Sequence, residues 1–320
     1  MGHVVLVTGA ARNLGRRFSA LIAAQSGVDR VIAVDVVPPA EPIDGVDFVR
    51  ADIRNPVIAK VMAEADVDTV VHLGVIATPR QAGGRATMKE INVIGSMQLL
   101  AACQRTTSLR HLVVKSSAGV YGSGPKDPGM FTEDMDPRHA PRSGWAKDSA
   151  EVESYVRGFA RRRPDVEVTT LRFANIIDAT LHTAFTEYFT LPVIPTVLGF
   201  DPRLQFVHAD DALEMLRRSV VDPHRGTFNV AGPGVITLQQ AVRRTGRPQL
   251  PVPQVLLAPI GRNLSRFGLL DFSSEQVRHI TYGRVLDTTL VTSTFGFTPQ
   301  YSSAEAFEAF LRGSKVPSHA

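Results

Sequence analysis

The loop TGAARNLG near the start of the chain has the composition of an anion-binding turn. It follows the apolar run Val4 to Val7, which predicts a strand buried on both faces of a parallel sheet. Gly9 allows the chain to turn, and a helix is expected to begin near Leu14 and Gly15. Backbone N–H groups and a helix dipole then converge on one point, so this loop is predicted to cradle a pyrophosphate.

An acidic residue downstream indicates which anion the loop binds. The run Arg30 to Val34 predicts a second buried strand, and Asp35 ends it at roughly the 20-residue spacing of dinucleotide sites. A carboxylate there accepts hydrogen bonds from adenosine ribose hydroxyls and repels a 2′-phosphate. The loop and Asp35 therefore predict NAD, in preference to NADP, as the cofactor.

The loop departs from the usual pattern because Arg12 and Asn13 stand where a middle glycine is common. Asparagine tolerates positive φ better than most residues with a Cβ, so Asn13 is expected to hold the turn. Three positions stay open for Arg12: along the pyrophosphate, paired with Asp35, or in solvent.

Alternating strand and helix patterns predict the fold class, an α/β doubly wound parallel sheet of the Rossmann type. Beyond Asp35, strands are expected at 47–49, 69–73, 111–115 and 166–173, and helices at 56–65, 89–103 and 145–161. Asp52, Ile53 and Leu73 fall at the carboxyl ends of strands, where open α/β sheets bind ligands, and are predicted to contact the cofactor.

Domain boundaries follow from a change in the pattern near Asn175, where the alternation weakens and prolines increase. Residues 1–175 are predicted to form the dinucleotide-binding domain, to which a segment at about 203–232 returns. Residues 176–320 are predicted to form a smaller substrate-binding lobe.

Composition excludes several classes of protein. With 320 residues, 44% of them hydrophobic and 21% charged, the chain can bury a large core. Its net charge of +4 is spread along the sequence, so no nucleic-acid partner is expected. A short basic cluster, Arg161 to Arg163, falls where a helix should end.

Cys103 is the single cysteine and the histidines lack ligand spacing, which predicts no disulfide and no metal. No signal peptide or membrane-spanning run is evident, so a cytoplasmic protein is expected.

Together these segments resemble the extended short-chain dehydrogenase/reductase family, which includes nucleotide-sugar epimerases and dehydratases. The matching segments, in the order of the family, are TGAARNLG, VIAVD, ADIRNP, VVHLG, INVIGSMQLLAA, VKSSAGVYG, LRFANII, RLQFVHADDAL and GTFNVAG. The resemblance implies a small-molecule substrate, such as a nucleotide sugar, that carries a hydroxyl or keto group. It also implies a homodimer formed by helices 89–103 and 145–161.

The catalytic residues of the family are a Ser or Thr after the fifth strand and a Tyr-x-x-x-Lys pair on the next helix, whose lysine also holds the nicotinamide ribose. The resemblance assigns Ser117 to the first position. It places Trp145 at the tyrosine and Ser149 at the lysine, with Glu153 at a further acidic position. Because an indole N–H does not titrate usefully in water and serine carries no charge, the usual pair is predicted to be absent.

A register shifted by two residues stays open. It places Ser143 at the tyrosine and Lys147 at the lysine, and a lysine one helical turn away can activate a hydroxyl. The first register is preferred because Trp145 and Ala146, an aromatic followed by a small residue, fit the family pattern better. It leaves Lys147 and Asp148 in solvent.

Substrate contacts are also implied by the resemblance. Arg203 matches an arginine that grips the diphosphate, and Arg284 is a candidate second grip, since a guanidinium binds phosphate in a bidentate manner. For both arginines the alternative to diphosphate binding is a surface ion pair. For Arg284 the ion pair is the favoured interpretation. Asn175 and Tyr121 match positions near the substrate, although packing is the favoured interpretation of Tyr121. Asp178 replaces a small residue and so alters the expected pocket.

Two functions stay open on the sequence alone. The first is an NAD-dependent epimerase/dehydratase-like oxidoreductase with a substituted proton donor. The second is a dinucleotide-sensing or scaffold protein that has kept the fold without the chemistry. His72, at the end of the fourth predicted strand, is interpreted as structural rather than as the missing donor.

Overall fold

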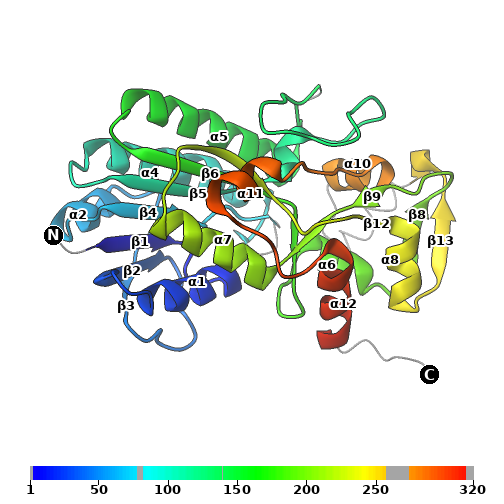
Figure 1. Cartoon of the computed structure of the whole chain (residues 1–320), viewed down its shortest axis with the longest axis horizontal. Helices are drawn as coiled ribbons and strands as arrows, with labels where there is room; N and C mark the ends of the chain where they lie inside the picture. The colour runs from blue at the N-terminus through cyan, green and yellow to red at the C-terminus, as the bar shows by residue number, and fades with distance from the viewer. Residues whose placement is uncertain (1–2, 78–81, 139, 257–273, 315–320) are drawn as a thin grey trace.

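The computed structural model describes residues 3–77, 82–138, 140–256 and 274–314. A seven-stranded parallel sheet forms its centre, with helices on both faces and a smaller lobe beyond the carboxyl ends of the strands (Figure 1). The strand order is β11-β6-β5-β4-β1-β2-β3. This arrangement confirms the predicted doubly wound sheet.

The elements of the first part of the chain agree closely with the predicted ones. The strands of the main sheet are β1 (Val4–Thr8), β2 (Arg30–Asp35), β3 (Val46–Arg50), β4 (Thr69–His72), β5 (His111–Ser117), β6 (Glu167–Phe173) and β11 (Gly226–Val230). The helices that cover it are α1 (Asn13–Ala23), α2 (Val57–Glu64), α3 (Arg85–Lys89), α4 (Ser96–Arg105), α5 (Gly144–Arg162), α7 (Ala209–Val221) and α11 (Thr289–Phe295).

One predicted helix is divided in the structure. The segment 89–103 contains the end of α3, a π-helical turn η2 (Glu90–Gly95) and most of α4. Asn92, at the centre of η2, is buried, and its amide bonds the N–H of Ile76 at 2.7 Å and the C=O of Ile76 at 2.9 Å. A π-helical turn changes the direction of a side chain within a helix, and here it coincides with an anchor for the loop after β4.

Two apolar layers fill the space between the sheet and its helices. On one face, Phe18 of α1, Leu216 of α7 and Val291 of α11 belong to the same core cluster. On the other, Met62 of α2 and Phe159 of α5 pack with residues of α4. The strands are therefore buried on both faces, which explains their continuous apolar runs.

The smaller lobe has its own core, built around phenylalanines and tyrosines. Its elements are β7 (Asn175–Ile177), α6 (Ala184–Phe189), β8 (Ile194–Val197), β9 (Arg203–Leu204), β10 (Phe206–His208), β12 (Ile236–Thr237), α8 (Leu238–Thr245), β13 (Gln249–Val252), α10 (Ser274–Tyr282) and α12 (Ser303–Gly313). The prediction that the whole segment 203–232 returns to the main sheet is wrong for its first strands. Within this segment, β9 pairs with β12 and β10 pairs with β7, so both belong to small sheets of the lobe. Only β11 joins the main sheet.

The helices of the expected dimer contact carry exposed apolar side chains. Ile94 of η2, Met97 of α4 and Tyr155 of α5 are all exposed. The dimer stays a prediction. None of the helices in the described ranges combines the length and the apolar character that crossing a membrane requires.

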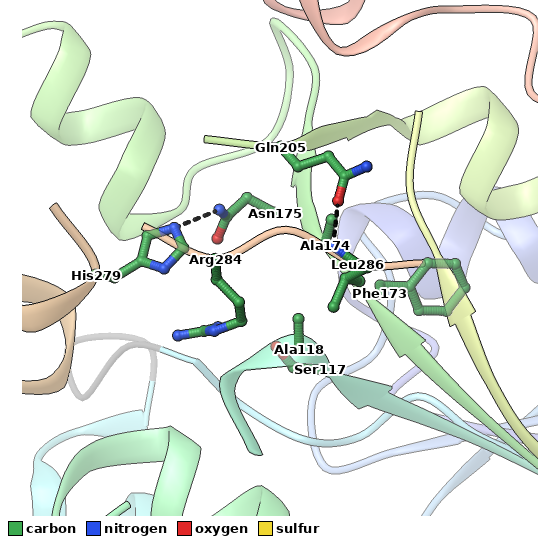
Figure 2. A pocket seen from close by; sticks show the side chains of 9 residues that line it. All are labelled: Ser117, Ala118, Phe173, Ala174, Asn175, Gln205, His279, Arg284 and Leu286. Carbon is green, nitrogen blue, oxygen red and sulfur yellow. Dashed lines mark hydrogen bonds between the residues drawn. The ribbon is translucent and has the colours of Figure 1, made fainter. Parts of the chain in front are cut away.

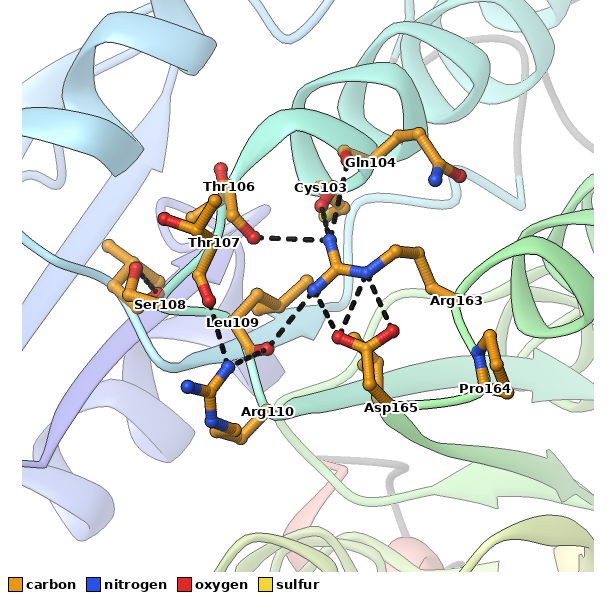
Figure 3. Close-up of polar contacts among 12 residues, drawn as sticks. Cys103, Gln104, Thr106, Thr107, Ser108, Leu109, Arg110, Arg163, Pro164 and Asp165 are labelled. Atoms are coloured by element: carbon orange, nitrogen blue, oxygen red, sulfur yellow. Dashed lines mark hydrogen bonds and ion pairs between the residues drawn. The ribbon is translucent and has the colours of Figure 1, made fainter.

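Arg163, directly after α5, joins the ends of two helices (Figure 3). Its guanidinium donates to the carbonyl oxygens of Cys103, Gln104 and Thr106 at 3.0, 3.3 and 3.1 Å. It also pairs with Asp165 at 2.7 Å. The last carbonyls of a helix lack partners within it and carry partial negative charge, so this cation closes the carboxyl end of α4.

Replacing Arg163 by alanine is expected to lower the free energy of unfolding by about 2 kcal/mol, because several partly buried carbonyls lose a charged donor. Arg161→Ala removes an exposed arginine from the same run and is expected to change it by less than about 0.5 kcal/mol. Urea unfolding followed by circular dichroism measures both. Equal losses in the two variants would contradict the helix-end role of Arg163.

Candidate functional site

The glycine loop after β1 has the geometry of a phosphate cradle. Gly9 has a φ of +76°, and a Cβ on Gly15 would lie 2.1 Å from the Gly9 carbonyl oxygen, so both positions require glycine. Arg12 precedes α1 in an extended conformation, and its side chain makes no capping hydrogen bond to the helix. The first N–H groups of α1 therefore keep the capacity to bind an anion.

Asp35, at the end of β2, fastens this loop. Its Oδ2 accepts a hydrogen bond from the N–H of Ala11 at 3.1 Å, and its Oδ1 accepts one from Val36 at 2.8 Å. Burial lowers the pKa of the Arg12 guanidinium, and the charge of Asp35 opposes that effect. Arg12 is therefore partly buried in the vicinity of Asp35 and does not extend freely into solvent.

The predicted role of Asn13 is wrong. Asp66 is the one non-glycine residue with positive φ in the described part of the chain, whereas Asn13 is the first residue of α1. Glycine at position 9 supplies the turn, and the Asn13 amide instead donates to Thr180 Oγ1 at 3.1 Å. The side chain thereby connects α1 to the loop after β7.

The remaining predicted cofactor residues lie around this edge of the sheet. Leu14 and Leu73 are buried in the apolar layer under α1. Ile53 is buried in the opposite layer. Asp52 is paired with Arg54 at 2.6 Å, and the hydrogen bonds from this arginine lower the pKa of the Asp52 carboxyl.

His72, at the end of β4, has the contacts of a structural histidine. Its Nδ1 lies 2.7 Å from Thr8 Oγ1 and its Nε2 lies 2.8 Å from Ser96 Oγ. Burial, followed by the charge of Lys115, lowers the pKa of His72 to about 4. The ring is therefore neutral at physiological pH, with both nitrogens engaged.

A polar cavity lies where β5 ends (Figure 2). Its lining comes from both the main domain and the lobe, and consists of Ser117, Ala118, Phe173, Ala174, Asn175, Gln205, His279, Arg284 and Leu286. The cavity measures about 10 Å³, close to the space of one water molecule. This volume accommodates one hydroxyl or carbonyl oxygen of a ligand.

Arg284 lies in this cavity, so the favoured prediction of a surface ion pair is wrong. Its Nε donates to the carbonyl of Gly122 at 2.8 Å and its Nη2 donates to Ser123 Oγ at 3.0 Å. Burial lowers its pKa to about 10. Arg203, by contrast, is exposed and donates to the carbonyl of Gly129 at 2.9 Å. The two predicted grips thus have different surroundings.

His279, on α10, is a cavity residue that the sequence did not single out. Its Nε2 lies 3.2 Å from Asn175 Nδ2, its Nδ1 lies 3.5 Å from Ser123 Oγ, and its ring meets Phe185 edge to face. Burial, followed by the charge of Arg284, holds the pKa of His279 well below its usual value. No spacing connects this histidine to Ser117, because the docking of the lobe brings them together.

Tyr121 belongs to a buried network rather than to the cavity lining. Its hydroxyl donates to Asn229 Oδ1 at 2.9 Å and accepts from Arg172 Nη1 at 2.8 Å. Arg172 in turn pairs with Glu153 at 2.7 Å, and Glu153 accepts from Ser116 Oγ at 2.5 Å. Burial raises the pKa of Tyr121. The packing interpretation therefore describes Tyr121 better than the substrate contact does.

Trp145, at the expected tyrosine position, lies against the turn that follows Ser117. A Cβ on Gly119 would lie 2.7 Å from an indole carbon, so glycine makes room for the ring. The Ser117 hydroxyl itself accepts a hydrogen bond from the N–H of Gly119 at 3.0 Å. Ser149, at the lysine position, is buried on α5.

The residues of the shifted register have other partners. Ser143 bonds Ser274 at 2.8 Å between their hydroxyl oxygens, and the Lys147 amine lies 3.8 Å from a Glu151 carboxylate oxygen. These contacts give no support to a Ser143 and Lys147 catalytic pair.

The expectation that Asp148 is in solvent is wrong. Its side chain is fully buried and accepts from the two terminal nitrogens of Arg85 at 2.5 and 2.6 Å. The Asn92 amide donates to it at 3.2 Å. Burial is possible because these donors come from α3 and η2. Asp178 is likewise engaged, with Arg17 at 3.0 Å, and it is absent from the cavity lining.

Comparison with known proteins identifies the family. The sequence model of the NAD dependent epimerase/dehydratase family matches residues 5–231. The chain belongs to this family. The prediction of an extended short-chain dehydrogenase/reductase is thus confirmed, and the NAD predicted from Asp35 agrees with the cofactor of the family. Grouped metal ligands are also lacking: no three His, Cys, Asp or Glu side chains of the described residues are placed to hold an ion.

Individual relatives extend the comparison. An uncharacterized protein of Mycobacterium tuberculosis (strain ATCC 25618 / H37Rv) is 44% identical over 97% of this chain and 84% of its own length. UDP-glucose 4-epimerase of Neisseria gonorrhoeae is 30% identical over 55% of this chain and 54% of its own.

Solved structures share the fold. UDP-glucose 4-epimerase of Thermotoga maritima with UDP-glucose has a TM-score of 0.73 at 19% identity, covering 97% of this chain and 98% of that chain. dTDP-glucose 4,6-dehydratase of Bacillus anthracis in complex with NAD has a TM-score of 0.74 at 16% identity, covering 99% and 98%. These two similarities extend over the lobe as well as the main sheet.

Asp35→Ala is expected to weaken NAD binding about 10-fold or more and to reduce discrimination against NADP, because the carboxylate is the predicted acceptor for the ribose hydroxyls. Asp47→Ala is the matched control, since Asp47 lies on the neighbouring strand β3, half-exposed, and pairs with Arg30. Calorimetric titration with each cofactor gives the affinities. Unchanged affinities for both in Asp35→Ala would overturn the assignment of this residue.

Proposed function

We propose that this protein is an NAD-dependent oxidoreductase of the epimerase/dehydratase type that acts on a hydroxyl or keto group of a nucleotide sugar or a similar small molecule. The observation that carries the proposal is the placement of two sites at one edge of the sheet. The glycine cradle follows β1, and the polar cavity lies at the end of β5. Open α/β sheets bind cofactor and substrate in this crevice.

The cradle residues fit the pyrophosphate and adenosine parts of NAD. Gly9 and Gly15 allow the loop to pack directly against neighbouring backbone, and the uncapped start of α1 suits an anion. Asp35 is placed at the strand end where it can accept from ribose hydroxyls. Bound NAD supplies hydride transfer, and the protein supplies orientation and proton handling.

The cavity residues fit the polar end of a substrate. The Ser117 hydroxyl can donate to a substrate oxygen because the Gly119 N–H already occupies one of its acceptor positions. Asn175 and Arg284 supply further donors to the same small space. A guanidinium in a buried site stabilises an oxygen on which negative charge develops.

The proton must pass through a group other than the one usual in the family, since an indole does not exchange it. His279 is the titratable imidazole that lines the cavity with Ser117. What separates His279 from the structural His72 is its place in the cavity lining. Burial keeps its ring neutral, and a substrate hydroxyl that takes the place of Asn175 or Ser123 as the partner of the ring can pass its proton to the imidazole as it is oxidised and regain it in the reverse step. We assign the substituted donor to His279.

One observation favours the second candidate function, a dinucleotide sensor or scaffold. Trp145 fills the tyrosine position with a side chain that cannot transfer a proton, and Gly119 is fitted to it. Such a protein would bind NAD and NADH with different affinities and convert neither. Cofactor turnover separates the two candidates.

The test is a panel of nucleotide sugars incubated with the protein and NAD. The readouts are chromatographic separation of new sugars and the absorbance of reduced nicotinamide, because an epimerase or a dehydratase returns the hydride to its product and leaves no net NADH. At least one sugar is expected to be converted to a new sugar or to reduce the cofactor. His279→Gln keeps hydrogen-bonding capacity toward Asn175 and Ser123, and it is expected to lower kcat about 100-fold with NAD affinity unchanged. Ser117→Ala is expected to lower kcat to a similar extent.

Ser143→Ala serves as the control, because the Ser143 hydroxyl bonds Ser274 outside the cavity. Its turnover is expected to equal that of the unmodified protein. Tight NAD binding without turnover of any sugar would favour the sensor. A loss of turnover in Ser143→Ala alone would instead support the shifted register.

A further inference from the structure

Lys115 is a charged side chain at the cofactor edge that the proposed mechanism does not use. It lies on β5, opposite Leu171 of β6 and two residues before Ser117. Side chains alternate along a strand, so Lys115 projects from the same face as Val113. Val113 and Leu171 both belong to the core layer that also contains Phe18 of α1. Lys115 is therefore on the face of the sheet from which the glycine loop leads into α1.

The strand registers place Lys115 at the edge of the sheet that carries the cradle. Val114 pairs with His72, and His72 pairs with Thr8, the residue before Gly9. Burial, and then the positive charge of Arg12, lower the pKa of Lys115 to about 8. The charge of Lys115 in turn contributes to the lowered pKa of His72, at the end of β4. The amine thus lies within electrostatic reach of the glycine loop after β1 and of the end of the adjacent strand.

The anionic side chains of the surrounding elements are engaged elsewhere. On α7, Asp210 pairs with Arg17, and Asp211 accepts from the N–H groups of Gln300 and Tyr301. Asp178 also pairs with Arg17, and Asp35 lies beside Arg12. Glu153 of α5 belongs to the network of Arg172.

The immediate surroundings of Lys115 therefore lack a negative charge. Within the ranges that the structure describes, no hydrogen bond or ion pair holds its amine. A buried ammonium without a counter-ion is unfavourable, and an anionic ligand that arrives beside it removes the penalty. Two neighbouring cations, Lys115 and Arg12, next to the uncapped start of α1 form a site for a diphosphate.

We propose that Lys115 is a cofactor-binding residue that, together with Arg12, holds the anionic part of bound NAD. This inference rests on the cofactor named in the proposed function and does not depend on turnover.

The first test compares NAD affinities by calorimetry. Lys115→Met keeps the apolar stem and removes the charge, and it is expected to weaken NAD binding about 10-fold or more. Lys115→Arg keeps a cation and is expected to stay within about 3-fold of the unmodified protein. Lys60→Met is the control, because Lys60 is exposed on α2 and pairs with Glu64, and no change is expected.

The second test counts protons in the unmodified protein. The free amine is about half protonated near pH 8, and a bound diphosphate favours its charged form, so NAD binding at pH 8 is expected to take up about half a proton. The dependence of binding heat on the ionisation enthalpy of the buffer measures this uptake. Lys115→Met is expected to take up none.

The outcomes separate this inference from the proposed function. Failure of the unmodified protein to bind NAD overturns both. Normal binding of NAD by the unmodified protein and by Lys115→Met, with equal proton uptake, overturns the role of Lys115 alone. Lys115→Met should unfold at or above the temperature of the unmodified protein, since a buried charge is removed. If Lys115→Met fails to fold, proton uptake by the unmodified protein is the remaining test. NAD binding at pH 8 without proton uptake then contradicts the proposal.

Discussion

The rest of the structure depends on the direct contact between Gly15 and the carbonyl oxygen of Gly9. A Cβ at position 15 would come within 2.1 Å of that oxygen, so α1 can begin this close to β1 only because the side chain is absent. The start of α1 then faces the turn without a side-chain cap. Asp35 bonds the same loop and Arg12 lies beside Asp35. One steric constraint thus sets the position of the phosphate cradle and of the charges around it.

The second site combines groups from both parts of the chain. Ser117 ends a strand of the main sheet, whereas His279 and Arg284 come from the lobe and its return to the sheet. Trp145 packs against Gly119, two residues after Ser117, and its indole does not titrate, which is why the proposed function needs a different proton donor if Trp145 holds the tyrosine position. The cofactor end keeps the outer glycines of the loop and Asp35, and the proposed function assigns proton transfer at the other end to His279.

The sequence predicted the sheet, the glycine cradle and Asp35, because each depends on residues close together in the chain with a fixed period or spacing. It did not predict His279, whose place depends on how the lobe docks, or the burial of Arg284. The burial of Asp148 depends on hydrogen bonds from Arg85 and Asn92, which lie on other helices. The sequence of α5 alone therefore does not indicate that this side chain is buried. The prediction that Asn13 holds the turn is wrong because Gly9 already supplies the residue with positive φ.

The most direct test of the account uses Trp145, the single tryptophan of the chain. Tryptophan emission overlaps the absorption of reduced nicotinamide, and hydride transfer in the proposed function requires that ring of the cofactor to lie at the cavity, near Ser117 and the indole that packs on Gly119. Titration with NADH, with the tryptophan excited, should quench the Trp145 emission and raise the NADH emission, both saturating at one NADH for each chain. Unchanged Trp145 emission under conditions where calorimetry shows NADH bound would contradict this arrangement of cofactor and cavity.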